Sequence, residues 1–139
     1  MKSRDTLLRL KRFQLDEKRR KVAQVEMMIA EFDRMAADLD REIQNEEQKA
    51  KISDPTHFAY PTYARAAMVR RDNLRGSAAN LKGQLEEARL AVEEAFEELK
   101  KVETLENRET AREKAESSAR EQAQYDEISL SRHGMRARA

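Results

Sequence analysis

Hydrophobic residues recur every seven positions through the first third of the chain. One ladder consists of Leu8, Leu15, Val22, Ile29, Ala36, Ile43 and Ala50, and Val25, Phe32 and Leu39 lie three residues after three of its members. This spacing is typical of a helix that buries one narrow seam against another helix. It predicts a helix over residues 3–52.

A second ladder predicts a second helix, over residues 63–131. Its members alternate in steps of four and three: Leu74, Ala78, Leu81, Leu85, Ala88, Val92, Ala95, Leu99 and Val102. Pro55 and Pro61 separate the two ladders, and proline is poorly tolerated inside a helix, so we predict a loop over residues 53–62.

Together the ladders predict an all-α fold, a long antiparallel two-helix coiled-coil hairpin that forms a single domain over residues 1–131. Its seam is expected to contain Val22, Val25, Ile29, Phe32, Leu39, Ile43, Leu81, Leu85, Val92, Leu99 and Val102. Opposing the ladders about residues 58 and 59 pairs Ile43 with Leu74, Glu46 with Arg71, and Lys11 with Glu106. The apolar pattern fades beyond residue 102, which predicts an overhanging end of the second helix, followed by a disordered basic tail over residues 132–139.

Composition supports a coiled coil and narrows the function. Of the 139 residues, 40% are charged and 39% hydrophobic, with only three glycines and two prolines, as is typical of long helices. The net charge of +1 argues against a general nucleic-acid binder, and the absence of cysteine excludes disulfides and thiolate zinc sites. No apolar run reaches the length of a membrane span, so we expect a cytoplasmic protein without direct membrane insertion.

Candidate catalytic chemistry is sparse. An acidic block between residues 86 and 98 is best interpreted as a solvated helix face, because two helices offer no enclosed pocket. The histidines, His57 and His133, have no ligand-like residues around them. We therefore expect no catalytic residues, no metal, no cofactor and no enzymatic activity.

Charge and aromaticity point to protein partners. Residues 1–21 contain nine lysines and arginines against three acids, but only one aromatic residue, which favours a protein over a nucleic acid. The loop region carries Phe58, Tyr60 and Tyr63 within six residues. These aromatics fit two interpretations equally well: anchors for a partner, or a staple that closes the hairpin end.

Several segments resemble the flagellar export protein FliJ family, a component of the flagellar type III secretion apparatus. They are the leucine-rich LLRLKRFQLDEKRR near the start, the pair Tyr60 and Tyr63, the segment LKKVETLENRE over residues 99–109, and QYDEISLSRH before the basic tail. The resemblance spans nearly the whole chain. It implies a stalk-like pair of antiparallel helices that acts without catalysis of its own.

The resemblance also implies partners. They are the hexameric export ATPase, the cytoplasmic domain of the membrane export gate protein, and export chaperones, which would place the protein in the cytoplasm beside the inner membrane. The helix ends would bind the ATPase through Arg4, Leu7, Leu8, Lys11, Arg12, Leu15, Arg108 and Arg112. The loop and early second helix would bind the gate through Phe58, Tyr60, Tyr63, Ala67, Arg70 and Leu74. A generic coiled-coil adaptor or holdase-type chaperone is the alternative.

Overall fold

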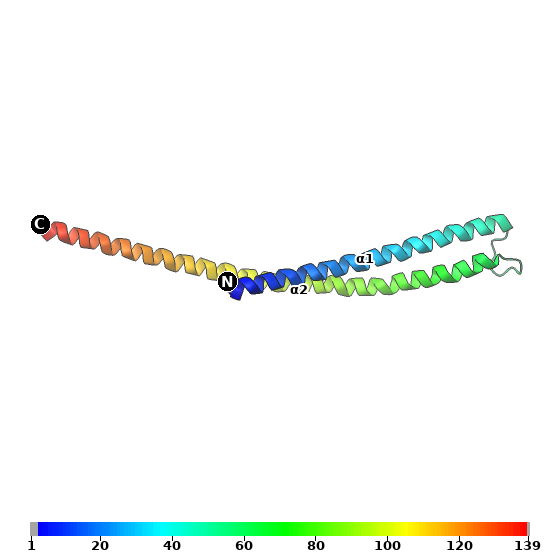
Figure 1. Cartoon of the computed structure of the whole chain (residues 1–139), viewed down its shortest axis with the longest axis horizontal. Helices are drawn as coiled ribbons and strands as arrows, with labels where there is room; N and C mark the ends of the chain where they lie inside the picture. Colours follow the sequence, from blue (N-terminus) through cyan, green and yellow to red (C-terminus); the bar gives the residue numbers. More distant parts are fainter. Residues whose placement is uncertain (1–2, 139) are drawn as a thin grey trace. The chain divides into compact units, whose positions relative to one another are not determined.

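The structure is a computed structural model that describes residues 3–138, and it consists of two long helices. Helix α1 spans Ser3–Ala50 and helix α2 spans Thr62–Arg138. Figure 1 shows α1 and the first part of α2 side by side, joined by the loop. The all-α two-helix fold is therefore confirmed. No helix in residues 3–138 is long and apolar enough to cross a membrane.

The chain divides into two compact units, which we call the hairpin unit (residues 13–96) and the terminal unit (residues 1–12 with 97–139). In the hairpin unit, the buried seam combines larger side chains with alanines: Leu15, Val25, Ala36 and Ile43 from α1, and Ala64, Ala67, Ala78, Leu81 and Ala88 from α2. The other seam residues predicted for this unit, Val22, Ile29, Phe32, Leu39, Leu85 and Val92, are half-buried. Burial of this stripe supplies most of the stability that two helices alone can gain.

The closed end of the hairpin has its own small core. Ile43, Tyr60, Ala64 and Ala67 form a buried cluster, and Leu39, Ile52 and Met68 pack against it. Helix α1 ends here because Lys51 adopts a left-handed conformation (φ 58°) and the Ile52 N–H donates to the Glu47 carbonyl at 3.3 Å. This pattern is a Schellman cap, and the apolar residue that follows it is ordinarily packed against the helix.

The register in the hairpin unit differs from the prediction by about one heptad. Ile43 packs with Ala67 instead of Leu74, and Arg71 binds Asp40 instead of Glu46. A seven-residue slip leaves most apolar ladder positions opposite another ladder position, so the repeat alone cannot select between the two registers. The small core at the closed end selects the shorter connection, because Tyr60 and Ala64 pack directly on Ile43.

The terminal unit is also antiparallel. Arg4 lies 3.3 Å from Glu106, and Lys11 lies 2.8 Å from Glu98 instead of the predicted Glu106. Leu8 and Leu99 are buried and Val102 is half-buried. Beyond Glu109, every side chain from residue 110 to residue 134 is exposed.

The helix boundaries need one correction. We predicted that the second helix ends at residue 131 and that residues 132–139 are disordered, but α2 continues to Arg138; residue 139 lies outside the described residues. Gly134 is not in a left-handed conformation, so it does not cap the helix, and the surrounding arginines and alanines have good helix propensity. At the other boundaries the shifts are small: α1 ends at Ala50, and α2 begins at Thr62.

Candidate interaction surfaces

The six residues predicted to bind the export gate fall into three places in the hairpin unit. Tyr63, Arg70 and Leu74 share a shallow groove, which is completed by Met35, Asp38, Leu39 and Glu42. Tyr60 and Ala67 are buried, with 4% and 5% of their surface exposed. Phe58 lies at the loop and is 94% exposed. The structure therefore brings three of the six residues together on one surface.

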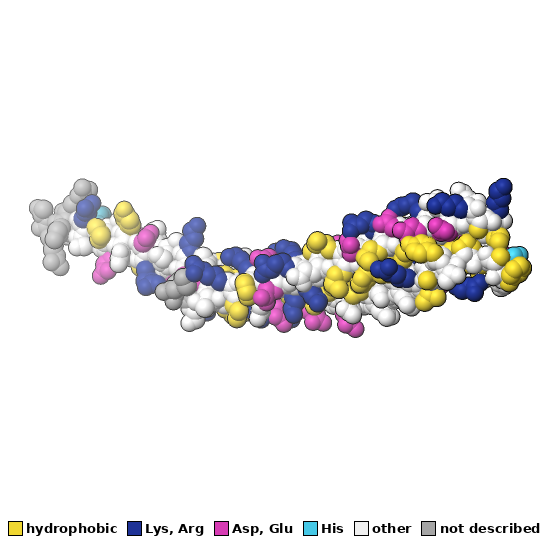
Figure 2. All heavy atoms as spheres, turned by 45° about the vertical axis from the view of Figure 1, so that its right-hand side comes forward, with side chains coloured by type: hydrophobic (Ala, Val, Ile, Leu, Met, Phe, Trp, Pro, Cys, Tyr) yellow, Lys and Arg dark blue, Asp and Glu magenta, His cyan; other side chains and the backbone are white. Residues whose placement is uncertain are grey.

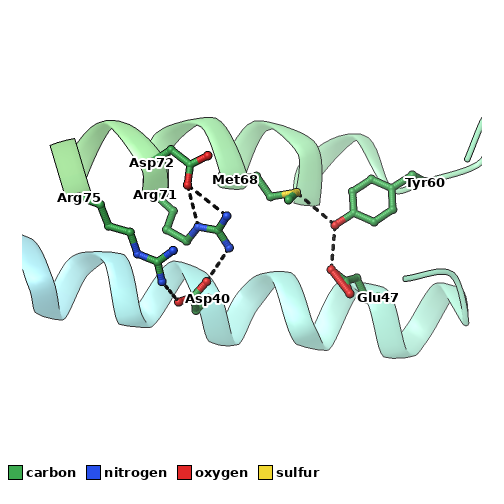
Figure 3. A network of polar contacts seen from close by, with 7 residues as sticks. All are labelled: Asp40, Glu47, Tyr60, Met68, Arg71, Asp72 and Arg75. Carbon is green, nitrogen blue, oxygen red and sulfur yellow. Dashed lines mark hydrogen bonds and ion pairs between the residues drawn. The ribbon is translucent and has the colours of Figure 1, made fainter. Parts of the chain in front are cut away.

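Tyr60 closes the hairpin from inside. Its hydroxyl donates to Glu47 Oε1 at 2.9 Å and lies 3.5 Å from the Met68 sulfur, as Figure 3 shows. The Arg65 guanidinium lies over its ring, 5.8 Å from the centroid. Burial, followed by the hydrogen bond to the Glu47 carboxylate, raises the pKa of Tyr60 above its usual value. The two interpretations of the loop aromatics thus apply to different residues: Tyr60 is the staple, whereas Phe58 and Tyr63 are exposed.

Tyr63 faces the shallow groove. The side chain is 55% exposed, and its hydroxyl donates to Glu42 Oε2 at 2.7 Å. This hydrogen bond, together with the negative charge of Glu42, raises the pKa of Tyr63. The contact fixes the ring across the helix pair, so the groove has an aromatic wall on α2, beside the exposed cation Arg70 and the half-buried Leu74.

An ion network holds the two helices together beside the groove. Arg71 Nη1 lies 2.7 Å from Asp40 Oδ1, and its Nε lies 3.1 Å from Asp72 Oδ1. Arg75 binds the other oxygen of Asp40, so that one carboxylate on α1 joins two arginines on α2 (Figure 3). The hydrogen bond to Asp40 raises the pKa of Arg71 further above its usual range. With only 17% of the Arg71 side chain exposed, this network is better shielded from water than an ordinary surface ion pair.

In the terminal unit, two of the four predicted ATPase-binding arginines, Arg4 and Arg112, meet around three glutamates. Arg4 lies 3.3 Å from Glu106, 3.9 Å from Glu109 and 3.1 Å from Glu113. Arg112 binds the same oxygen of Glu109 at 2.6 Å. The sequence indicated only that the apolar pattern fades beyond residue 102; in the structure these glutamates hold Arg4 on α2.

The other residues predicted to bind the ATPase differ in accessibility. Leu7, Arg12 and Arg108 are exposed, whereas Leu8 in the terminal unit and Leu15 in the hairpin unit are buried. Lys11 is held by Glu98, and this hydrogen bond lowers the pKa of the Glu98 carboxyl. Leu7, Arg12 and Arg108 are therefore the predicted residues most able to contact a partner directly.

Sequence reasoning missed two exposed leucines of the terminal unit. Leu10 is 48% exposed and Leu105 is 61% exposed. Leu105 lines a surface hollow on α2 with Lys100, Lys101, Thr104 and Arg108. The available signal was their position outside the apolar ladders, because a leucine that is not needed in the seam is free to face a partner.

The described residues show no grouping suited to a metal ion. Among the described residues, no group of three or more histidine, aspartate or glutamate side chains is arranged to hold a metal ion. His57 stacks on Phe58, and its Nδ1 accepts a hydrogen bond from the Ala59 N–H at 3.0 Å. His133 lies in the exposed stretch of α2.

Comparison with known families identifies the chain. The family model described as flagellar FliJ protein matches residues 1–138. The chain belongs to the FliJ family. No curated protein and no solved structure matched it. As a member of this family, the chain is a component of the flagellar export system. This flagellar export component therefore has two exposed regions that could contact other parts of the export system: the groove of the hairpin unit and residues 110–134 of α2 in the terminal unit.

Proposed function

We propose that this FliJ-family chain is a non-enzymatic coupling element of flagellar protein export. The terminal unit binds the hexameric export ATPase and promotes its assembly and activity. The groove of the hairpin unit binds the cytoplasmic domain of the membrane export gate protein. Export chaperones are further partners, and the chain works in the cytoplasm, peripherally associated with the export apparatus at the inner membrane.

The observation that carries the proposal is the exposed end of α2. Every side chain from residue 110 to residue 134 is exposed, including Tyr125 at 72%, Ile128 at 52% and Leu130 at 73%. A helix of this length gains little stability from its own hydrogen bonds, and most helices in proteins are stabilised by packing of an apolar face. A helix whose apolar residues are exposed in this way is suited to burial in a larger assembly.

The groove of the hairpin unit supports the second contact. Tyr63 is held in place by Glu42, so its ring is fixed before a partner arrives. Arg70 adds a cation and Leu74 an apolar surface in the same groove. Aromatic and arginine side chains dominate the binding energy of many protein interfaces, and fixing them in advance reduces the entropy lost on binding.

The test separates the two contacts. Arg12→Glu with Arg108→Glu changes only exposed residues and should weaken binding to the purified export ATPase by about tenfold, equivalent to roughly 1.4 kcal/mol. Tyr63→Ala with Arg70→Glu should weaken binding to the gate domain by a similar factor. Each double variant should leave the other contact unchanged, as measured by titration calorimetry.

The result that would overturn the proposal is equally specific. If both double variants reduce both affinities alike, or if neither partner binds the wild-type chain, the two surfaces are not separate docking sites. Normal helicity of each variant in circular dichroism excludes unfolding as the cause. Capture of unfolded client proteins in place of the two partners would favour the alternative, a coiled-coil adaptor or holdase-type chaperone.

A further inference from the structure

Phe58, in the loop at the hairpin end, is almost fully exposed to solvent. Phe58 is 94% exposed, more than any other large hydrophobic residue of the described side chains. It stacks on His57, with ring centroids 4.7 Å apart and an interplanar angle of 22°. The neighbouring Tyr60 turns inward and is buried. The loop therefore buries Tyr60 and leaves Phe58 in water, which gives up the free energy that burial of the Phe58 ring would contribute.

The loop that carries Phe58 is held by internal hydrogen bonds. Asp54 Oδ1 accepts from both the N–H and the hydroxyl of Thr56, at 2.9 and 2.8 Å. Two turns follow, closed by His57 N–H to the Asp54 carbonyl and by Tyr60 N–H to the His57 carbonyl, each at 3.1 Å. The Arg65 guanidinium donates to the Pro55 carbonyl at 3.1 Å. Phe58 is thus presented from an ordered support.

Two basic residues lie in and next to the loop that carries Phe58. Within residues 51–66, Lys51 and Arg65 stand against a single acid, Asp54, whose carboxylate accepts two hydrogen bonds from Thr56. On the last turns of α1, Glu46 and Lys49 lie 4.0 Å apart and offset each other's charge, and Glu47 accepts from the Tyr60 hydroxyl. Figure 2 shows hydrophobic, histidine, and lysine or arginine side chains together at this end.

Lys51 occupies a position at which glycine is the usual residue. Its φ of 58° is unfavourable for a side chain, yet the chain places a lysine there and not a glycine. Lys51 is exposed, and it makes no ion pair with any described residue. A positive charge close to the C-terminus of α1 is favourable in itself, and it also adds a cation to the loop that carries Phe58.

We propose that the hairpin end docks on an anionic lipid bilayer. Phe58 enters the boundary between headgroups and acyl chains, and Lys51 and Arg65 lie over acidic headgroups. A protein partner would ordinarily form hydrogen bonds with the loop as well as fit its shape. The Asp54 carboxylate and several backbone groups of the loop are already hydrogen-bonded within the loop, so fewer groups are available to such a partner. The loop itself then offers the Phe58 ring and the positive charges of Lys51 and Arg65, which a bilayer surface can accept without further matching. The proposal concerns a surface contact, and it does not depend on the proposed ATPase and gate partners.

The chain allows a direct probe because it contains no tryptophan. Phe58→Trp places a single indole at the loop, and the emission of this indole shifts to shorter wavelength when it leaves water. Vesicles of phosphatidylcholine with one third phosphatidylglycerol should produce this shift and protect the indole from iodide, more strongly at low salt than at high salt. Tyr125→Trp is the matched control, since Tyr125 is an exposed aromatic in the terminal unit, 72% exposed; its emission should not shift.

A second pair of variants tests the charge without risk to the fold. Lys51→Gly, combined with Phe58→Trp, removes the cation and suits the left-handed conformation, so it should fold at least as well. It should weaken vesicle binding about fivefold, the effect expected for one basic residue near an acidic surface. Lys114→Gln, on the exposed part of α2, removes the same charge and should have no effect.

Three results would overturn the proposal. They are an unshifted Phe58→Trp emission at every lipid concentration, an equal shift for Tyr125→Trp, or equal binding to vesicles of phosphatidylcholine alone. An unshifted emission on vesicles, together with a shift on adding the gate domain, would instead make Phe58 an anchor for protein.

Discussion

Replacing Asp40 with asparagine tests the register of the hairpin unit. Asp40 accepts hydrogen bonds from both Arg71 and Arg75, whereas the register expected from the heptads would place Glu46 opposite Arg71. Asp40→Asn keeps the size of the side chain and removes its charge. Both arginines then lose their anionic partner on α1, although Arg71 retains Asp72 on its own helix.

The size of the effect follows from burial. A hydrogen bond to a charged group contributes roughly 1.5–3 kcal/mol when it is shielded from water. The Asp40 side chain is 31% exposed, Arg71 keeps one partner, and asparagine can still accept one bond, so we expect a loss of about 1–2 kcal/mol in the free energy of unfolding. For a chain of this length, the melting temperature should fall by about 3–6 °C.

The assay is thermal and urea unfolding, followed by circular dichroism at 222 nm, with two matched controls. Asp38→Asn breaks an exposed pair with Arg41 on the same helix and should change stability by less than about 0.5 kcal/mol. Glu46→Gln should also have a small effect, because the ion pair of Glu46 is with the exposed Lys49 on the same helix, at 4.0 Å. If Glu46→Gln destabilises the chain more than Asp40→Asn does, the register in the structure is wrong and the register expected from the sequence is right.

Three further predictions concern the core, the staple and the open helix. Ile43→Ala should lower the free energy of unfolding by about 2–4 kcal/mol in urea, because Ile43 is only 4% exposed and packs in one cluster with Tyr60. Met27→Ala, at a side chain that is 73% exposed, should lower it by less than about 0.5 kcal/mol. Equal losses would contradict the assignment of Ile43 to the buried seam. Tyr60→Phe should lower the free energy of unfolding by about 1 kcal/mol at neutral pH, because it removes the hydrogen bond to Glu47. The folded pKa of Tyr60 is raised above its usual value of 10.0, so the stability that its hydroxyl contributes is present below pH 10 and is lost as the pH rises through the folded pKa. Between pH 8 and pH 11, the urea midpoint should therefore fall less in the variant than in the wild type. Ending the chain after Glu116 should leave the urea midpoint unchanged and reduce only the helical signal, because residues 117–134 are exposed; a lower midpoint would mean that this part of α2 stabilises the rest.

The fold could be predicted from the sequence because two heptad ladders separated by two prolines allow few other structures. The register could not, since a heptad repeat is unchanged by a slip of seven residues. Closing interactions decide it: Tyr60 and Ala64 pack on Ile43, and Asp40 binds Arg71. None of these contacts follows from periodicity, because each depends on how far the loop reaches.

The candidate surfaces were predictable in part. Residue types indicated that the loop aromatics matter, but only the structure separates the buried Tyr60 from the exposed Phe58 and Tyr63. Likewise, the basic start of the chain was evident, while the capture of Arg4 by Glu106 and its neighbours depends on the pairing of α1 with α2. Sequence supplies the residue types, and pairing decides which of them remain available to a partner.

The most direct test of the proposed function is ATP hydrolysis by the flagellar export ATPase, measured with increasing amounts of this chain alongside gel filtration of the mixture. The account predicts faster turnover together with formation of a larger complex. It also predicts that Arg12→Glu with Arg108→Glu reduces both effects, while Tyr63→Ala with Arg70→Glu reduces neither. Unchanged turnover and separate elution of the two proteins would contradict the coupling role.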